Sequence, residues 1–168
     1  MVGGALTVLA FGAGAFALTG GGDRTPAAAA QGVAAGGERV LGSGTAGAFE
    51  VGVTGSECGH TAVGPDDLRQ VAKGEFCLVS VVVKNNGGQP ALLDGGAQQA
   101  IDVVGQVYPV SDQAAVFLND QQPSLLDEVG AGATVRGVLP FDVPAGTKLS
   151  ALMVHEAMDG AATRVPFS

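Results

Sequence analysis

Residues 76–88 read FCLVSVVVKNNGG, the strongest strand signal in the sequence. Every second residue is apolar, at positions Cys77, Val79, Val81 and Val83. Alternation with a period of two is typical of a β-strand with one buried face. Leu78 and Val82 add apolar side chains on the other face, which favours a central strand over an edge strand. Residues 85–88 (Asn-Asn-Gly-Gly) tolerate positive φ, so we expect the strand to end there and the chain to reverse.

Short apolar alternations of the same kind surround this strand. We expect strands at residues 49–54, 77–83, 90–93, 99–104, 106–109, 134–143, 149–155 and 163–167. Turns rich in Gly, Pro and Asn separate them, at a spacing of roughly 8–12 residues. Longer loops are expected at residues 59–74 and 111–128, and no segment has a convincing helical period. The sequence therefore predicts an all-β fold, an antiparallel β-sandwich of seven or eight strands.

Charge and length limit the possible functions. The 168 residues include 8 Lys and Arg and 16 Asp and Glu, which gives a formal net charge of −8. An acidic surface opposes phosphate backbones and anionic lipid headgroups, and the sequence has no basic stripe or aromatic platform. We therefore expect no nucleic-acid partner. The length leaves room for one domain of roughly 120 residues behind a non-globular N-terminal part.

The N-terminal part differs from the rest in composition. Residues 1–20 contain no charged side chain, and about 20 apolar residues are enough to cross a hydrocarbon core of about 30 Å. This segment is predicted to be either a signal peptide or a membrane anchor. Residues 21–48 are rich in Gly and Ala, and are predicted to be a flexible linker. The folded domain is then expected at residues 49–168, outside the cell or on its surface, with membrane contact only through residues 1–20.

Cys58 and Cys77 are the only cysteines in the chain. A single pair in an exported protein most often forms a disulfide, which here would join the opening strand to the central one. Closing a loop of about 20 residues stabilises the fold by about 3 kcal/mol in the chain-entropy account. The alternative is a metal site of Cys58, Cys77 and His60, which lacks a fourth ligand and any Cys-x-x-Cys spacing. We therefore predict the disulfide, with no metal site and no cofactor.

No group of residues has the spacing of a catalytic site. His60 and His155 are the only histidines and lie far apart in the sequence. The paired carboxylates at residues 66–67 and 127–128 lack the Asp-x-Asp-x-Asp-Gly pattern of a calcium loop. There is no Gly-x-Ser-x-Gly elbow and no phosphate-binding glycine loop. The sequence therefore predicts that the protein is not an enzyme.

Four short motifs follow one another along the predicted domain. They are Val83-Lys84-Asn85, an Asp-x-x-Gly-x-x-Tyr hairpin at residues 102–108, a Gly-Ala-Gly turn at residues 130–132, and Phe-Asp-Val-Pro-x-Gly at residues 141–146. With these motifs, residues 49–167 resemble an actinobacterial exported domain-of-unknown-function family related to the immunoprotective extracellular protein. The resemblance implies an immunoglobulin-like β-sandwich in a secreted or surface-bound interaction module. It brings no catalytic residues with it.

Function in a sandwich is expected in the loops, because the core fixes the faces of the strands. The loop at residues 111–128 mixes polar and apolar groups, and its candidate interaction residues are Phe117, Leu118, Asn119, Asp120, Gln121 and Gln122. The first hypothesis is therefore a non-enzymatic binding module outside the cytoplasm, with an unknown protein or cell-envelope partner. The second is a carrier of a small ligand or metal ion that uses His60, His155 and nearby carboxylates.

Overall fold

The computed structural model describes residues 37–121 and 124–168. The predicted signal peptide or anchor at residues 1–20 lies outside this part of the chain, as do residues 21–36 of the predicted linker and Gln122. Within the described residues, no helix is long and apolar enough to cross a membrane.

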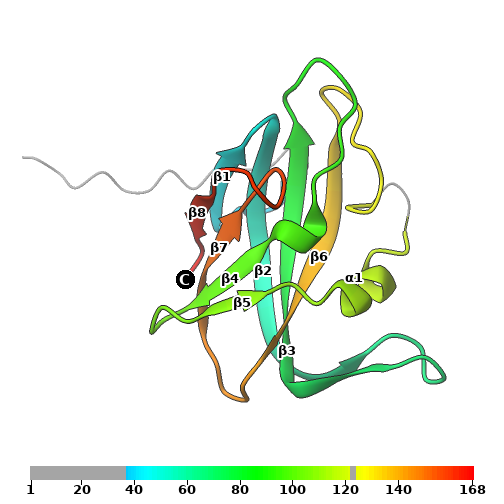
Figure 1. Cartoon of the computed structure of the whole chain (residues 1–168), viewed down its shortest axis with the longest axis vertical. Helices are drawn as coiled ribbons and strands as arrows, with labels where there is room; N and C mark the ends of the chain where they lie inside the picture. Colours follow the sequence, from blue (N-terminus) through cyan, green and yellow to red (C-terminus); the bar gives the residue numbers. More distant parts are fainter. Residues whose placement is uncertain (1–36, 122–123) are drawn as a thin grey trace, which may run out of the picture.

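Eight strands in the described ranges form two antiparallel sheets that pack face to face (Figure 1). In spatial order, the first sheet contains β1 (Gly42–Ala46), β2 (Phe49–Val63), β3 (Gln70–Asn85) and β6 (Thr134–Val143). The second contains β5 (Val107–Pro109), β4 (Gln99–Asp102), β7 (Leu149–Val154) and β8 (Thr163–Pro166). A 3-10 helix, η1 (Gly95–Ala97), and an α-helix, α1 (Asp112–Leu118), lie in the connections. The predicted all-β class is confirmed, and two packed antiparallel sheets are the architecture of immunoglobulin-like sandwiches.

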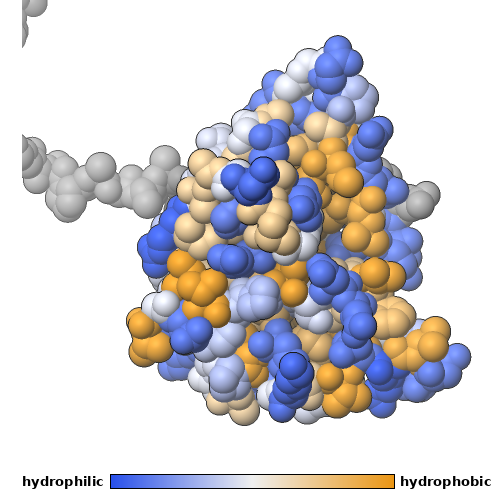
Figure 2. Space-filling view, in the orientation of Figure 1, coloured by the Kyte–Doolittle hydropathy of each residue, from blue (hydrophilic) through white to orange (hydrophobic). Residues whose placement is uncertain are grey.

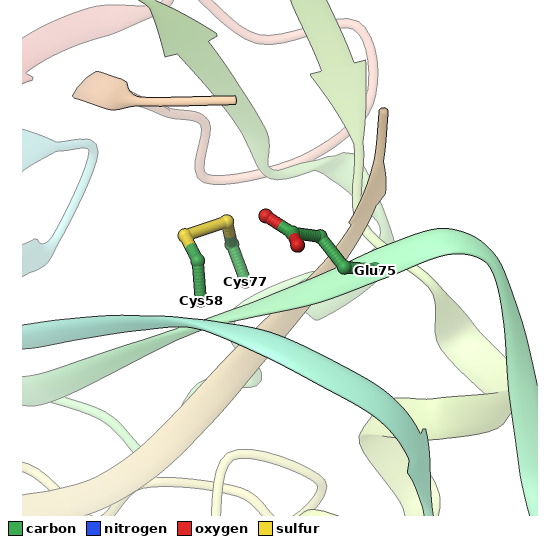
Figure 3. A group of neighbouring side chains, drawn as sticks. All are labelled: Cys58, Glu75 and Cys77. Carbon is green, nitrogen blue, oxygen red and sulfur yellow. A yellow bond between two sulfur atoms is a disulfide. The ribbon is translucent and has the colours of Figure 1, made fainter. Parts of the chain in front are cut away.

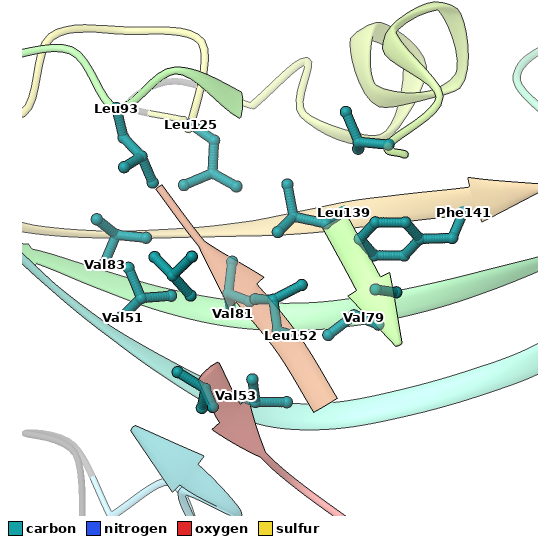
Figure 4. Packing of buried hydrophobic residues seen from close by; sticks show 14 of the residues in the cluster. Val51, Val53, Val79, Val81, Val83, Leu93, Leu125, Leu139, Phe141 and Leu152 are labelled. Carbon is teal, nitrogen blue, oxygen red and sulfur yellow. The ribbon is translucent and has the colours of Figure 1, made fainter. Parts of the chain in front are cut away.

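The central strand of the first sheet is β3, as its sequence predicts. It pairs with β2 on one side and with β6 on the other, and Val81 lies opposite Val53 of β2. Val79 and Val83 are buried together with Val81 between the sheets. In Figure 4 Val81 lies beside Leu152, which comes from β7 in the second sheet. Burying one valine side chain contributes about 1.5–3 kcal/mol, so the alternating valines of β3 are a main source of the stability of the core.

The outer face of β3 is partly covered as well. A second apolar cluster lies between the first sheet and α1, and contains Val63, Phe76, Leu78, Ala114 and Leu118. Leu78 belongs to this cluster, which explains why the sequence of β3 is apolar on both faces.

The C-terminal strands agree well with the sequence. β6 has the predicted bounds, and β7 and β8 each end one residue before the predicted end. The predicted hairpin around Gly105 is formed by β4 and β5, and Gly105 has a φ of 91°. This positive φ is the conformation that favours glycine at the tip of a tight turn.

The folded domain begins before residue 49, so the predicted boundary is wrong. β1 lies inside the predicted linker and pairs with β2, with Ala46 opposite Phe49. The other edge of β1 lies beside β8 (Figure 1), and a Cβ placed on Gly44 would be only 2.7 Å from Cγ2 of Val165. This close approach requires small residues in β1. A strand made of small residues has the same composition as a linker, which is why the sequence misled us.

The predicted loop at residues 59–74 is also wrong, because β2 and β3 continue as one long hairpin. Only residues 64–69 lie between the two strands. The pairing shifts register after Glu57 and again after His60, and Gly59 has a φ of 96°. Such bulges interrupt the alternation of apolar and polar side chains by which a strand is recognised in a sequence.

Two further predictions fail in the connections between the sheets. Residues 90–93 form no strand: within the described residues, only Ala91 bridges to another segment, at Val129, and Pro90 has no amide hydrogen to donate. Residues 111–128 were expected to be a loop but contain α1, whose Ala114 is buried against the first sheet. A helix of seven residues repeats its apolar positions too few times for the period to be recognised.

Two side chains of the sequence motifs form hydrogen bonds with backbone groups near the ends of strands. Asn85 is fully buried, and its Nδ2 donates hydrogen bonds of 2.8 Å to the carbonyl oxygens of Gln89 and Val129. The carboxylate of Asp142 accepts hydrogen bonds from the backbone amides of residues 73–74, at distances from 2.9 to 3.2 Å. Asp142 thus caps an irregular part of β3. A buried polar group that keeps its hydrogen bonds avoids a penalty of about 1–3 kcal/mol.

The hairpin between β4 and β5 is organised by Asp102. Its carboxylate accepts hydrogen bonds from the backbone amides of Val104 (2.9 Å) and Gln106 (2.8 Å) and from the hydroxyl of Tyr108 (3.0 Å). Burial raises the pKa of Asp102, but the hydrogen bonds from these groups outweigh it, so the pKa lies below its usual value. Burial and the hydrogen bond to the carboxylate raise the pKa of Tyr108. The Asp-x-x-Gly-x-x-Tyr motif is thus a structural device of the hairpin.

A chain that starts at Phe49 should be less stable than one that starts at Gly37. The shorter chain lacks β1 and also loses Val40 and Ala46, which are buried in the complete domain. Burial of Val40 alone is worth about 1.5–3 kcal/mol, and each kcal/mol corresponds to a shift in Tm of about 2–8 °C. Urea denaturation of both chains measures the difference. Equal denaturation midpoints would show that β1 contributes nothing to the domain.

Replacing Asp102 with Asn should destabilise the hairpin in a pH-dependent way. Because the pKa of Asp102 is lowered by folding, its contribution to stability is present above the unfolded pKa of about 4 and is lost as the pH falls through the folded pKa. We therefore expect Asp102→Asn to lower the denaturation midpoint at pH 7, and the gap to wild type to narrow at strongly acidic pH.

The exposed Asp67 provides a matched control. The difference in denaturation midpoint between Asp67→Asn and wild type is not expected to narrow at acidic pH. If the gap for Asp102→Asn were the same at all pH values, the carboxylate charge would play no part in holding the turn.

Candidate functional site

A groove of about 430 Å³ lies beside α1. It lies between the segment that joins β3 to β4 on one side and α1 with the segment before β6 on the other. Most of its lining is aliphatic, and the principal residues are Leu92, Leu93, Val116, Leu125, Leu126 and Leu139. In Figure 2 apolar surface extends over the upper right of the molecule, where these two segments face each other.

The leucines of the groove divide into a buried floor and an exposed rim. Leu93, Leu125 and Leu139 are buried and belong to the main core. The rim residues are about half exposed, at 54% for Leu92, 54% for Val116 and 49% for Leu126. Scattered exposed apolar residues are normal, but three around one groove form a contiguous patch of the kind found at binding surfaces.

Asn119 holds α1 against the sheet. Its Nδ2 donates hydrogen bonds of 2.8 Å to the carbonyl oxygens of Ala115 and Val138, and its Oδ1 accepts one of 2.9 Å from the amide of Val138. These bonds link the C-terminal end of α1 to β6, a strand at the edge of the first sheet. Asn119 is only 5% exposed. That Asn119 contacts a partner stays a prediction, and in the structure it positions the wall of the groove.

The other predicted interaction residues have mixed outcomes. Phe117 is half-buried, and its ring lies 2.9 Å from where a Cβ on Gly64 would be. Leu118 is half-buried in the cluster beneath α1. Asp120 and Gln121 are exposed, as expected. Gln122 lies outside the described residues.

The apolar residues of the groove were missed by the sequence interpretation. Their signal is present in the two Leu-Leu pairs, at residues 92–93 and 125–126. Leu93 is the buried member of the first pair and Leu125 that of the second. Their neighbours, Leu92 and Leu126, are half exposed. An adjacent pair of leucines in a loop cannot bury both side chains against the same core, so one must be left at the surface.

One end of the groove is acidic. Asp94, Asp112 and Glu156 line this end, and no Lys or Arg is among the described residues that line the groove. Two of these carboxylates converge: a Cβ placed on Gly96 would lie 3.0 Å from an oxygen of Asp112 and 3.4 Å from an oxygen of Asp94. Like charges that converge beside an apolar surface favour a cationic group on whatever binds there.

The predicted disulfide between Cys58 and Cys77 is confirmed. It joins β2 to β3 within one sheet, with the two Cα atoms 3.9 Å apart. Figure 3 shows the carboxylate of Glu75 pointing toward the disulfide. These three residues are the one group of possible metal ligands within the described ranges. Because both sulfur atoms are bonded to each other, neither is available as a thiolate ligand.

His60 and His155 do not join the group of Cys58, Glu75 and Cys77. His60 lies in β2, where its Nε2 is 3.7 Å from a carboxylate oxygen of Glu57. His155 follows β7, and its Nδ1 lies 3.3 Å from the carbonyl oxygen of Gly160. Neither belongs to a group of three possible metal ligands in the described part of the chain. The arrangement gives no support to the hypothesis of a carrier that uses both histidines.

Comparison with known structures finds two similar folds. A secreted protein from Mycobacterium tuberculosis, MPT63, is 17% identical, with 68% of this chain and 81% of that chain covered and a TM-score of 0.48. A conserved hypothetical protein from Bacillus anthracis is 15% identical, with 75% and 92% covered and a TM-score of 0.49. Comparison with curated proteins gives no match.

A family model matches residues 43–165, which is more than two thirds of the chain. The match begins inside β1 and ends inside β8, so it spans both sheets. It agrees with the resemblance to a domain-of-unknown-function family seen in the sequence motifs. The chain therefore belongs to the family described as Domain of unknown function (DUF4352).

Proposed function

We propose that this domain is an exported, non-enzymatic binding module that takes an apolar and cationic segment of a partner protein into the groove beside α1. The observation that carries the proposal is the exposed rim of Leu92, Val116 and Leu126 next to converging carboxylates. The rim favours aliphatic or aromatic side chains of a partner, and the acidic end favours a Lys or Arg.

The disulfide supports a location outside the cytoplasm. Structural disulfides form and persist in oxidising compartments, and are rare where thiols are kept reduced. Cys58 is exposed at the surface of β2, so its bond with Cys77 would be accessible to cytosolic reductants. The uncharged segment at residues 1–20 supplies the corresponding export signal or anchor.

The polar groups of the groove support binding more than chemistry. Asp94 accepts a hydrogen bond from the amide of Ala97 as the cap of η1, and Glu156 accepts one of 3.3 Å from the amide of Ala48. Asn119 is fully engaged by α1 and β6. The described residues that line the groove include no His, Cys, Ser or Lys, and its titratable side chains are the carboxylates of Asp94, Asp112 and Glu156.

A short fluorescent peptide of alternating Leu and Lys residues tests the groove. We expect purified protein to bind it, and Leu126→Asp to weaken binding by roughly fivefold or more, because about 1 kcal/mol or more of apolar contact is lost. Fluorescence anisotropy measures the affinity. Peptides in which Glu replaces Lys, or Ser replaces Leu, should bind more weakly than the parent.

Val71 provides the matched control, because it is an exposed valine that does not line the groove. Val71→Asp adds the same charge and is expected to leave binding unchanged. Equal loss of binding in Leu126→Asp and Val71→Asp would mean that the loss does not arise at the rim of the groove, and the groove would not be the binding site.

Export has its own test in cells of the native host. We expect full-length protein to be digested when protease is added to intact cells, and to carry no free thiol when it is alkylated without reductant. Recovery of protease-protected protein with two free thiols would place the domain in the cytoplasm and contradict the proposal.

A further inference from the structure

The tip of the hairpin between β4 and β5 is a second exposed apolar surface. Val104 is 85% exposed, and Val103 and Val107 beside it are also exposed. In Figure 2 this tip is apolar and projects at the lower left of the molecule. Contiguous exposed valines at a projecting turn are unfavourable in water and indicate a contact surface.

The tip is held in one conformation before any contact is made. The carboxylate of Asp102 accepts hydrogen bonds from the amides of Val104 and Gln106, on either side of Gly105. The amide of Val103 donates a hydrogen bond of 3.0 Å to the carbonyl oxygen of Lys148, in the turn between β6 and β7. A preorganised tip loses little conformational entropy when it docks.

Lys148 also gives the tip a positive charge. Its side chain is exposed, and its backbone carbonyl oxygen accepts the hydrogen bond from the amide of Val103. The tip therefore presents valines beside a cation. This is the chemistry that the groove favours, because the groove presents an aliphatic rim beside Asp94 and Asp112.

We propose that the hairpin tip of one copy of this chain docks into the groove of a second copy. The inference rests on the groove that the proposed function assigns as a binding site, and it names one partner for it. Tip and groove lie on opposite sides of the molecule (Figure 1), so one copy can use both at once. A contact between two different surfaces of the same chain is heterologous, and produces rings or open chains of copies rather than closed two-fold dimers.

The association is expected to be weak. One hairpin tip buries less area than the roughly 1,200–2,000 Å² of a standard stable interface. The net charge of −8 also repels copies from each other, although salt at a physiological concentration screens this repulsion beyond about 8 Å. We therefore expect a molar mass that rises with protein concentration, measured by sedimentation equilibrium at physiological salt.

Two variants separate the two surfaces. Val104→Asp removes the apolar tip and keeps the groove, whereas Leu126→Asp removes the rim and keeps the tip. Each variant alone should associate at least roughly fivefold more weakly than the wild type. A mixture should form dimers that contain one chain of each kind and nothing larger, because one intact tip and one intact groove remain. A monomeric wild type up to its solubility limit, or a mixture without dimers, would overturn the inference.

Lys148→Glu and Val71→Asp complete the design, since both residues are exposed. Lys148→Glu should weaken association roughly two- to fivefold, as loss of a surface charge pair does. Val71→Asp should leave it unchanged, and an equal loss in both variants would assign the effect to net charge and overturn the inference. If the Leu-Lys peptide binds in the groove while copies of the chain do not associate, this inference fails and the proposed function stands.

Discussion

The register of β3 is the constraint on which the rest of the structure depends. A slip by one residue would turn Val79, Val81 and Val83 out of the core and replace them with the residues of the opposite face. The strand is fixed against such a slip near its middle and at its end. Cys77 is bonded covalently to Cys58 of β2, and Asn85 is bonded to two carbonyl oxygens of neighbouring segments. Between these points the pairing with β2 and β6 has no freedom to shift.

A fixed β3 places β6, and β6 places the groove. Val138 of β6 exchanges hydrogen bonds with Asn119, which ends α1, and Leu139 contributes to the floor of the groove. Gly137 leaves the space that this arrangement needs, because a Cβ there would collide with Leu125 and Asn119. The walls of the groove are α1 and two irregular segments, and α1 is tied to β6 by the side chain of Asn119. The groove is therefore held in place by contacts with the first sheet, and Leu139 of β6 is part of its floor.

The sequence was informative where side chains alternate and uninformative where backbone geometry decides. β6 and residues 77–83 of β3 were predicted well, because each alternates over several residues next to a partner with the same period. β1 was missed since its glycines exist to admit β8, a reason that only the folded chain shows. The disulfide followed from the cysteine count, whereas Asn119 looked like a surface residue because its partner, Val138, is 19 positions away. The groove needed three segments to be placed at once, which no local pattern specifies.

The position of the two chain ends has a mechanical consequence. β1 and β8 lie side by side, and a Cβ on Gly42 would touch the backbone of Pro166, so the chain enters and leaves the domain at one corner (Figure 1). A pulling force applied between the two ends would break the contacts of β1 with β8 one after another. The force would not act on all of these contacts at the same time. Such a corner yields at low force. The stretch between Cys58 and Cys77 would stay closed even at full extension, because the disulfide carries the load past it.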